Sequence, residues 1–358
     1  MIGVIGGYGN IGTYTINALL ELGEENIKVG GRNRKKSKLV FPMLPFQNVD
    51  VKNEEEIEQF VKDCSIIVNC TGPSARGRSI VTEVCKRKKM HLVDVGMSEM
   101  EFSMKIRRET TATFVHGAGA SPGFSSLITR WGGEKLGNVR SIEVYMGFLD
   151  TFTRTAAEDY MHGVFGSFNL NGKCWRDSKV CISDLCKEKK NLPYFQTEST
   201  IIPFFDTESE YVATNMNISS GKWYTVIDEP SIEECLLKIQ KEYFNDLDAA
   251  VDKLCSVTRI ATLGRKNYMN LLIQYNTEKQ TKDTVVVLSN GPAELSGYTA
   301  AATVLAIKDR ELETGEYALA QLKDPNIIIR KLKKNKRISI NLIHKGIDEL
   351  LNEEEGEI

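Results

Sequence analysis

Six residues near the start of the chain have the spacing of a phosphate-binding turn. Gly7, Tyr8, Gly9, Asn10, Ile11 and Gly12 form a GxGxxG pattern between an apolar run, Ile2–Ile5, and a helix-like stretch, Thr13–Leu22. This strand–turn–helix context gives the pattern its meaning. We expect Gly7 to permit the tight turn, Gly9 to admit a pyrophosphate and Gly12 to let the helix pack closely. The free N–H groups at the helix start then bind phosphate. The alternative is an ordinary strand–helix turn.

The end of the second predicted strand, Ile27–Val29, indicates which dinucleotide binds. NAD enzymes place an acidic residue there, whereas this chain continues with two glycines and then Arg32, Asn33 and Arg34. A carboxylate would repel a 2′-phosphate, but two guanidinium groups form charge-assisted hydrogen bonds with it. The pattern therefore predicts NADP(H) rather than NAD(H). The alternative is a solvated basic turn.

Further candidate residues follow three later strands. Parallel strands place their carboxyl ends along one edge of a sheet, where ligands bind. We expect Cys70, Thr71, Gly72, Pro73, Asp94 and Val95 to contact the cofactor, with Thr71, Gly72 and Pro73 beside the nicotinamide ribose. Asp94 is also a candidate catalytic residue; the alternative is a buried acid that caps the next turn. His116 is a candidate proton carrier, or else a structural histidine.

These segments resemble the saccharopine dehydrogenase-like oxidoreductase family. The resemblance follows the whole chain in order and is most specific in residues 1–125. It rests on the glycine turn and the Gly-Arg-Asn-Arg strand end, and on the segments Val68–Pro73, His91–Gly96, Gly117–Phe124, Ser296–Ala301 and Glu313–Glu316. His116 and Ser121 depart from the smaller or acidic residue expected in saccharopine-forming members, which argues against an aminoadipate-type substrate. Family members include reductases that join an amine to a carbonyl compound through an imine.

The resemblance also directs attention to the crossing into a second domain. There we expect Ser121, Pro122, Gly123 and Phe124 to contact substrate. At the start of the next helical region, Tyr160 is a candidate catalytic residue. Arg154 is the candidate for bidentate binding of a substrate carboxylate, the alternative being an ordinary surface arginine.

The elements that must position these residues alternate between short strands and helices up to residue 123. This rhythm predicts an α/β fold: a doubly wound, Rossmann-type parallel sheet. Residues 124–296 then change to α+β organisation, with an antiparallel hairpin formed by Tyr268–Tyr275 and Thr284–Leu288. We expect this second domain to supply the substrate contacts and the interface of a homodimer. Residues 297–358, beginning with an Ala-rich helix, are expected to pack back on the first domain.

Composition excludes several classes of partner. The formal net charge is −2, which gives no clustered positive charge for nucleic acid, and no apolar stretch is long enough for a membrane helix. We therefore expect a cytoplasmic protein whose eight cysteines are reduced thiols. Cys174, Cys181 and Cys186 lie close in sequence, but their spacing matches no common zinc pattern, and no metal site is predicted.

Together these observations predict an NADPH-dependent reductase of an imine or carbonyl carbon in a small, amino-acid-derived metabolite. Two alternatives stay open. An enoyl reductase of carrier-bound or lipid acyl chains would need a long apolar tunnel. A non-catalytic NADP sensor or scaffold would bind the cofactor without turnover.

Overall fold

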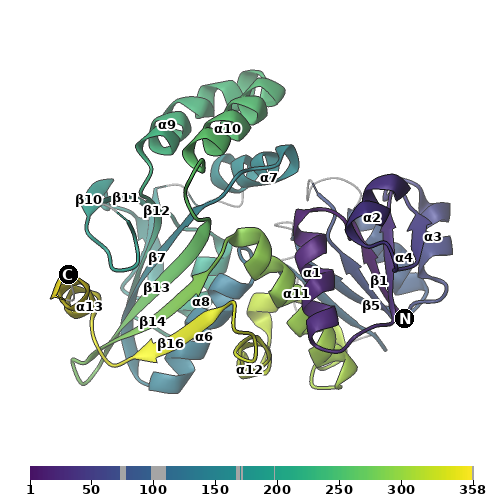
Figure 1. The fold of residues 1–358 in the computed structure, drawn as a ribbon. Helices are drawn as coiled ribbons and strands as arrows, with labels where there is room; N and C mark the ends of the chain where they lie inside the picture. Colours follow the sequence, from purple (N-terminus) through teal and green to yellow (C-terminus); the bar gives the residue numbers. More distant parts are fainter. Residues whose placement is uncertain (73–77, 98–109, 167–169, 171, 197, 357–358) are drawn as a thin grey trace. The chain divides into compact units, whose positions relative to one another are not determined.

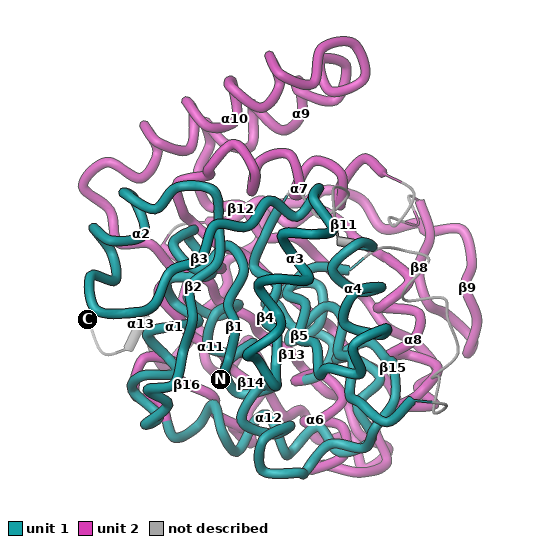
Figure 2. Tube along the Cα trace, turned by 90° about the vertical axis from the view of Figure 1, so that its right-hand side faces the viewer, with its two compact units in different colours: residues 1–127, 293–334 teal, residues 128–292, 335–358 magenta. Residues whose placement is uncertain are grey.

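The computed structural model describes residues 1–72, 78–97, 110–166, 170, 172–196 and 198–356. The chain divides into two compact units (Figure 2): residues 1–127 with 293–334, and residues 128–292 with 335–358. Pro73 and the helix predicted near Glu99–Glu109 lie outside the described residues.

The first unit is built on the predicted parallel sheet, which is confirmed. Within the described residues the strand order is β15-β6-β5-β4-β1-β2-β3, and every neighbouring pair is parallel. The strands are β1 (Ile2–Ile5), β2 (Ile27–Gly31), β3 (Phe46–Asn48), β4 (Ile66–Asn69), β5 (His91–Asp94), β6 (Thr113–His116) and β15 (Gly315–Ala318). Strands β1 and β4 are buried along their whole length. Their sequences are therefore apolar runs rather than alternating patterns.

Helices cover this sheet (Figure 1). They are α1 (Asn10–Glu21), α2 (Arg34–Val40), α3 (Glu54–Val61), α4 (Arg78–Arg87), α11 (Pro292–Lys308) and α12 (Asn326–Leu332), with a 3₁₀ turn at Leu319–Gln321. An apolar cluster joins α3 and α4 to the strands; Phe60, Leu92 and Phe114 are almost completely buried in it. This packing holds the strand ends, and the loops that follow them, in place.

Residues 293–334 return to the first unit and add a strand that was not predicted. Helix α11 is buried almost all round, as its Ala-rich sequence allows, and its Gly297 lies against α1, where a Cβ atom would come within 2.5 Å of Tyr14. The chain then adds strand β15 beside β6, which the sequence analysis did not anticipate. The four residues of β15 are too few to show a clear alternation.

The second unit contains a mixed nine-stranded sheet in the described residues. Its main order is β10-β11-β12-β7-β13-β14-β16, and the hairpin β8–β9 pairs with β12. The strands are β7 (Val139–Leu149), β8 (Lys173–Arg176), β9 (Lys179–Ile182), β10 (Glu188–Lys190), β11 (Ser199–Pro203), β12 (Ser220–Ile227), β13 (Tyr268–Thr277), β14 (Lys282–Ser289) and β16 (Ser339–Ile343). Strands β13 and β14 form the antiparallel hairpin that the sequence predicted.

Helix α6 (Phe124–Leu136) begins in the first unit and continues into the second. The other helices of the second unit are α7 (Arg154–Phe165), α8 (Thr207–Asn215), α9 (Pro230–Asn245), α10 (Leu247–Ala261) and α13 (Ile347–Gly356). Helices α7, α9 and α10 lie together (Figure 1). They share one apolar cluster that includes Met161, Ile239 and Leu254.

The division of the C-terminal residues differs from the sequence-based one. Residues 297–358 were all expected on the first domain, but β16 pairs with β14 in the second sheet. Ile347 and Leu350 of α13 are buried in the core of that unit. The reason is that apolar residues alternate along the β16 segment, so this segment pairs as a strand with the edge of β14.

Candidate cofactor and substrate site

The glycine turn joins β1 to α1 without room for side chains. A Cβ atom on Gly12 would lie 2.2 Å from the carbonyl oxygen of Gly6, so only glycine lets the helix start this close to the strand. Gly6 has a φ of 75°, whereas Gly7 has no positive φ. The tight-turn role predicted for Gly7 therefore falls to Gly6, because a left-handed backbone at that residue reverses the chain. Gly7 instead packs against Ile16 of α1.

The start of α1 is open to an anion. Gly9 is its N-cap residue and, having no side chain, makes no capping hydrogen bond. The first N–H groups of a helix have no intrahelical acceptor, so those of Asn10, Ile11 and Gly12 are available to a ligand. Nearby, Thr13 donates its hydroxyl to the Gly9 carbonyl oxygen at 2.7 Å and stiffens the turn.

Tyr8 connects the glycine turn to the end of β2. Its hydroxyl oxygen accepts a hydrogen bond from the backbone N–H of Asn33 at 2.8 Å. Its ring lies so close to Gly31 that a Cβ atom there would be 2.5 Å away. The Asn33 side chain in turn caps α2 by accepting from the N–H of Lys36. Tyr8 and Asn33 thus fix the strand end that carries Arg32 and Arg34.

Arg32 and Arg34 are exposed beside this strand end, and neither forms an ion pair with a described residue. Two guanidinium groups without a carboxylate partner suit a phosphate ligand. The sequence analysis identified these arginines but not the bridging role of Tyr8, which depends on contacts across 25 residues.

A buried hydrogen-bond network joins the loops after β4 and β5. The Asn69 amide donates to Asp94 Oδ2 at 2.9 Å, and Asn69 Oδ1 accepts from the Thr71 hydroxyl at 2.6 Å. Asp94 Oδ1 accepts from the backbone N–H of Gly96 at 3.0 Å. Asn69 and Asp94 are fully buried. Asp94 therefore positions the two loops, the capping role that the sequence left open, and Thr71 is held at the sheet edge by Asn69.

Cys70 and Val95 are part of the frame around this network. The Cys70 carbonyl oxygen lies directly against Gly6, and burial raises the pKa of the Cys70 thiol to about 12. Val95 is buried, and its N–H donates to the Asn69 carbonyl oxygen. Gly72 follows Thr71 at the exposed end of the loop. The sequence analysis did not name Asn69 as a candidate residue, although a polar residue at the end of a buried apolar strand could have indicated it.

The turn that contains Pro122 and Gly123 is hydrogen-bonded to helix α11. Ser296 accepts a hydrogen bond from the N–H of Ala120 at 3.0 Å, and a Cβ atom on Gly123 would overlap the Gly117 carbonyl oxygen at 1.7 Å. Ser121 is exposed and Pro122 is partly exposed, so both side chains are accessible to a ligand. Phe124, in contrast, is fully buried.

His116 lies in a buried ionic cluster with Glu316 and Lys86. Glu316 Oε1 is 3.2 Å from His116 Nε2 and 2.9 Å from Lys86 Nζ. Burial of Glu316 opposes ionisation, but the hydrogen bonds and charges of His116 and Lys86 outweigh it and lower the Glu316 pKa to about 2. The cluster joins β6, β15 and α4, as the structural alternative for His116 requires, and its role as a proton carrier stays a prediction.

Tyr160 and Arg154 both belong to the second unit. Tyr160 lies in an aromatic cluster, with ring centroids 5.2 Å from Phe152 and 5.8 Å from Phe148, and burial raises its pKa to about 12. Arg154 contacts two carboxylates of α10, Asp248 Oδ1 at 2.6 Å and Asp252. Its guanidinium group is thus already paired in this structure.

A small cavity lies beside Tyr160 in the second unit. Its volume is about 20 Å³, enough for a water-sized group, and the residues that line it include Phe148, Phe152, Tyr160, Asp150, Asp228 and Glu229. Burial raises the pKa of Asp150.

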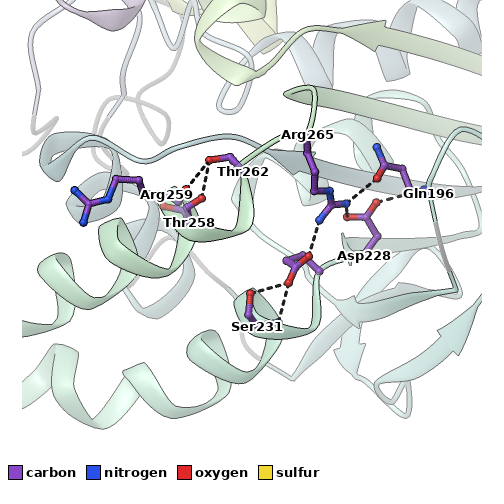
Figure 3. Close-up of polar contacts among 8 residues, drawn as sticks. Gln196, Asp228, Ser231, Thr258, Arg259, Thr262 and Arg265 are labelled. Carbon is purple, nitrogen blue, oxygen red and sulfur yellow. Dashed lines mark hydrogen bonds and ion pairs between the residues drawn. The ribbon is translucent and has the colours of Figure 1, made fainter.

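Arg265 offsets part of the negative charge of these carboxylates. Its guanidinium group donates hydrogen bonds to Glu229 and, at 2.9 Å, to Gln196. It also lies 3.9 Å from Asp228 (Figure 3). The cavity wall therefore combines these polar groups with apolar side chains such as Val226, Ile227 and Leu236.

Comparison with known proteins gives these contacts a context. The profile of the family described as "Saccharopine dehydrogenase NADP binding domain" matches residues 2–120. Residues 2–120 are a saccharopine dehydrogenase-type NADP-binding domain. A comparison with curated protein sequences gave no match.

Among solved structures, the apo saccharopine dehydrogenase (L-Glu forming) of Saccharomyces cerevisiae is similar along almost the whole chain. The similarity has a TM-score of 0.69 at 14% identity and covers 95% of this chain and 98% of the yeast chain. Shorter matches include a triphenylmethane reductase of Citrobacter sp. complexed with NADP(H), with a TM-score of 0.26 at 19% identity, covering 29% of this chain and 40% of that one. The NADPH-dependent quinone oxidoreductase QOR2 of Escherichia coli has a TM-score of 0.28 at 14% identity, covering 44% and 62%. The yeast match shows that the two chains share a fold.

The residues of the NADP-binding domain fit this cofactor. The uncapped start of α1 and the side-chain-free cradle of Gly6, Gly9 and Gly12 suit a pyrophosphate. Arg32 and Arg34 suit the 2′-phosphate that distinguishes NADP(H) from NAD(H). None of the described helices combines the length and apolar character needed to cross a membrane. Among the described residues, no group of His, Cys, Asp or Glu side chains is arranged to hold a metal ion.

Proposed function

We propose that this NADP-dependent oxidoreductase reduces the imine or carbonyl carbon of a small, amino-acid-derived metabolite. The observation that carries the proposal is the NADP-binding domain itself, whose loops after β4 and β5 are joined at one sheet edge by the Asn69–Asp94 hydrogen bond. The N–H groups at the start of α1 would hold the pyrophosphate, and the loops after β4 and β5 would lie beside the nicotinamide half, because ligands of doubly wound sheets bind at this edge.

Bound NADPH supplies the hydride. The chain supplies positioning: α1 and the two arginines hold the phosphates, and the Asn69–Asp94–Thr71 network fixes the loop beside the nicotinamide ribose. Asp94 acts here as a positioning residue, because its two carboxylate oxygens accept from Asn69 and Gly96. Exposed Ser121 and partly exposed Pro122 are the described loop residues proposed to contact the substrate.

The substrate class rests on one support. The yeast protein that shares the fold over nearly its full length is named as an L-Glu-forming saccharopine dehydrogenase, and L-Glu is an amino acid.

The test is the absorbance of NADPH in mixtures of the protein with amino acids and keto acids or aldehydes. We expect oxidation of NADPH only with an amine and a carbonyl compound together if the acceptor is an imine, and with the carbonyl compound alone if the acceptor is a carbonyl carbon. The same mixtures with NADH serve as the cofactor control. If a broad panel gives no turnover while calorimetry still detects NADPH binding, reductive amination is excluded for this protein.

A further inference from the structure

Two cysteines of the second unit face each other across a β-hairpin. Strands β8 and β9 are joined by Asp177 and Ser178, both with positive φ, and the strand register places Cys174 opposite Cys181. Their sulfur atoms are 3.4 Å apart. Although the cysteines of the chain are all described, no other two sulfurs lie within hydrogen-bonding distance of each other among the described residues.

The backbone geometry allows these sulfurs to bond. Directly opposed residues of antiparallel strands have Cα atoms about 4.5–5.5 Å apart. That spacing lies inside the range of roughly 4.4–6.8 Å that a disulfide spans. The sulfurs already touch, so rotation about the two Cα–Cβ bonds is enough to close the bond while the strands stay in register.

The two thiols differ in exposure. Cys174 is only 4% exposed, and burial together with the Cys181 contact raises the pKa of its thiol. Cys181 is partly exposed on the outer strand of the hairpin. A dissolved reagent therefore reaches Cys181 first, and Cys174 is held in position to react second.

We propose that Cys174 and Cys181 form a reversible dithiol–disulfide pair whose oxidant is a low-molecular-weight disulfide. The Cys181 thiolate attacks one sulfur of that disulfide, and the other sulfur leaves as a thiolate that takes up a proton. The Cys174 sulfur then loses its proton to solvent, attacks Cys181 Sγ and expels the second small thiol. Two protein thiols are oxidised, and one disulfide is reduced to two thiols.

The hairpin's attachment to the sheet explains what the bond would stabilise. In the described residues, strand β8 pairs with β12 through Arg176 and Trp175, opposite Ser220 and Gly221. The Trp175 indole N–H donates to the Ile218 carbonyl oxygen at 2.8 Å, and the Ser178 N–H donates to the Ser219 carbonyl oxygen at 3.0 Å. Because the pairing of β8 with β12 spans two residue pairs, a covalent link between β8 and β9 restricts the hairpin more than it would a central strand.

The experiment treats the reduced, full-length protein with oxidised glutathione, blocks the remaining thiols and digests with trypsin. Trypsin cleaves after Lys173, Arg176 and Lys179, so the two cysteines fall on separate peptides that stay joined only through a disulfide. We expect mass spectrometry to find these peptides linked. The link should disappear on treatment with a dithiol reductant.

Three variants identify the partners. The Cys181 peptide also contains Cys186, so Cys186→Ser must retain the link and Cys181→Ser must abolish it. Cys174→Ser should trap glutathione on Cys181. The matched control Cys255→Ser, a partly exposed cysteine on α10, should behave as the wild type. Unlinked, fully blocked peptides in the wild type, or a link that persists in Cys181→Ser, would overturn the proposal.

Binding of phenylarsine oxide gives a second measurement that needs no oxidation. A trivalent arsenical binds two neighbouring thiols, so the wild type and Cys186→Ser should bind it, and Cys174→Ser and Cys181→Ser should not. Equal binding by all four folded proteins, with folding checked by circular dichroism, would show that these sulfurs do not act as a pair.

Discussion

At the scale of single residues, Gly12 shows why the phosphate-binding turn tolerates so little change. Gly12→Ala places a Cβ atom 2.2 Å from the Gly6 carbonyl oxygen, which forces α1 away from the turn. We expect a loss of roughly 1–3 kcal/mol in the free energy of unfolding and much weaker NADPH binding. Thermal unfolding and fluorescence titration with NADPH measure the two effects.

The matched control for Gly12 is Gly163 on α7. Nothing lies within 4 Å of a Cβ atom there, so Gly163→Ala should leave NADPH affinity unchanged and stabilise the helix slightly. Equal effects of the two substitutions would refute the steric explanation.

At the same scale, the two exposed arginines after β2 are proposed to select NADPH over NADH. Each charge-assisted hydrogen bond contributes about 1.5–3 kcal/mol. Arg32→Ala and Arg34→Ala should therefore weaken NADPH binding roughly 10- to 100-fold. The affinity for NADH, which lacks the 2′-phosphate, should stay the same.

Calorimetric dissociation constants for both nucleotides measure this selectivity. The control is Arg259→Ala, which removes another exposed arginine, on α10 of the second unit. A parallel loss of NADH and NADPH affinity in Arg32→Ala would place that arginine elsewhere on the cofactor.

At the scale of elements, Glu316 links β15 to β6 and α4 through charge. Its pKa is lowered from 4.5 to about 2 in the folded protein. A group with a lowered folded-state pKa stabilises the fold above its unfolded pKa and loses this contribution as pH falls through the folded value. The shift corresponds to about 3 kcal/mol, fully present above about pH 5 and lost progressively down to pH 2.

Urea unfolding at a series of pH values measures this dependence. Glu316→Gln should flatten the stability curve between about pH 5 and 2, because the amide does not titrate. Glu25→Gln, which alters an exposed carboxylate with no ion pair to a described residue, should follow the wild-type curve. An unchanged curve in Glu316→Gln would mean that other groups carry the acid sensitivity.

At the scale of the whole molecule, the chain crosses between its two units more than once. Removing residues 335–358 takes away β16, one of the two strands that pair with β14, together with the buried side chains of Ile347 and Leu350. Burial of each such side chain contributes roughly 1.5–3 kcal/mol, so the second unit should lose several kcal/mol. The first unit should keep its sheet and its affinity for NADPH.

Hydrogen exchange distinguishes the two units in this truncated chain. Protection should fall at β14 and β13 and persist at β1 and β4. Uniform loss of protection would instead show that the units unfold as one.

The sequence by itself determined the parallel sheet, the glycine turn and the basic end of β2, because each depends on residues close together in the chain. It also predicted the β13–β14 hairpin from local alternation. Only the tertiary structure decided that Asp94 and His116 lie in buried networks, since their partners Asn69 and Glu316 are 25 and 200 residues away. It likewise assigned β16 to the second sheet. Local sequence specifies backbone preference and apolar pattern, whereas the partner of a buried charge or a strand edge depends on which distant segments the fold brings together.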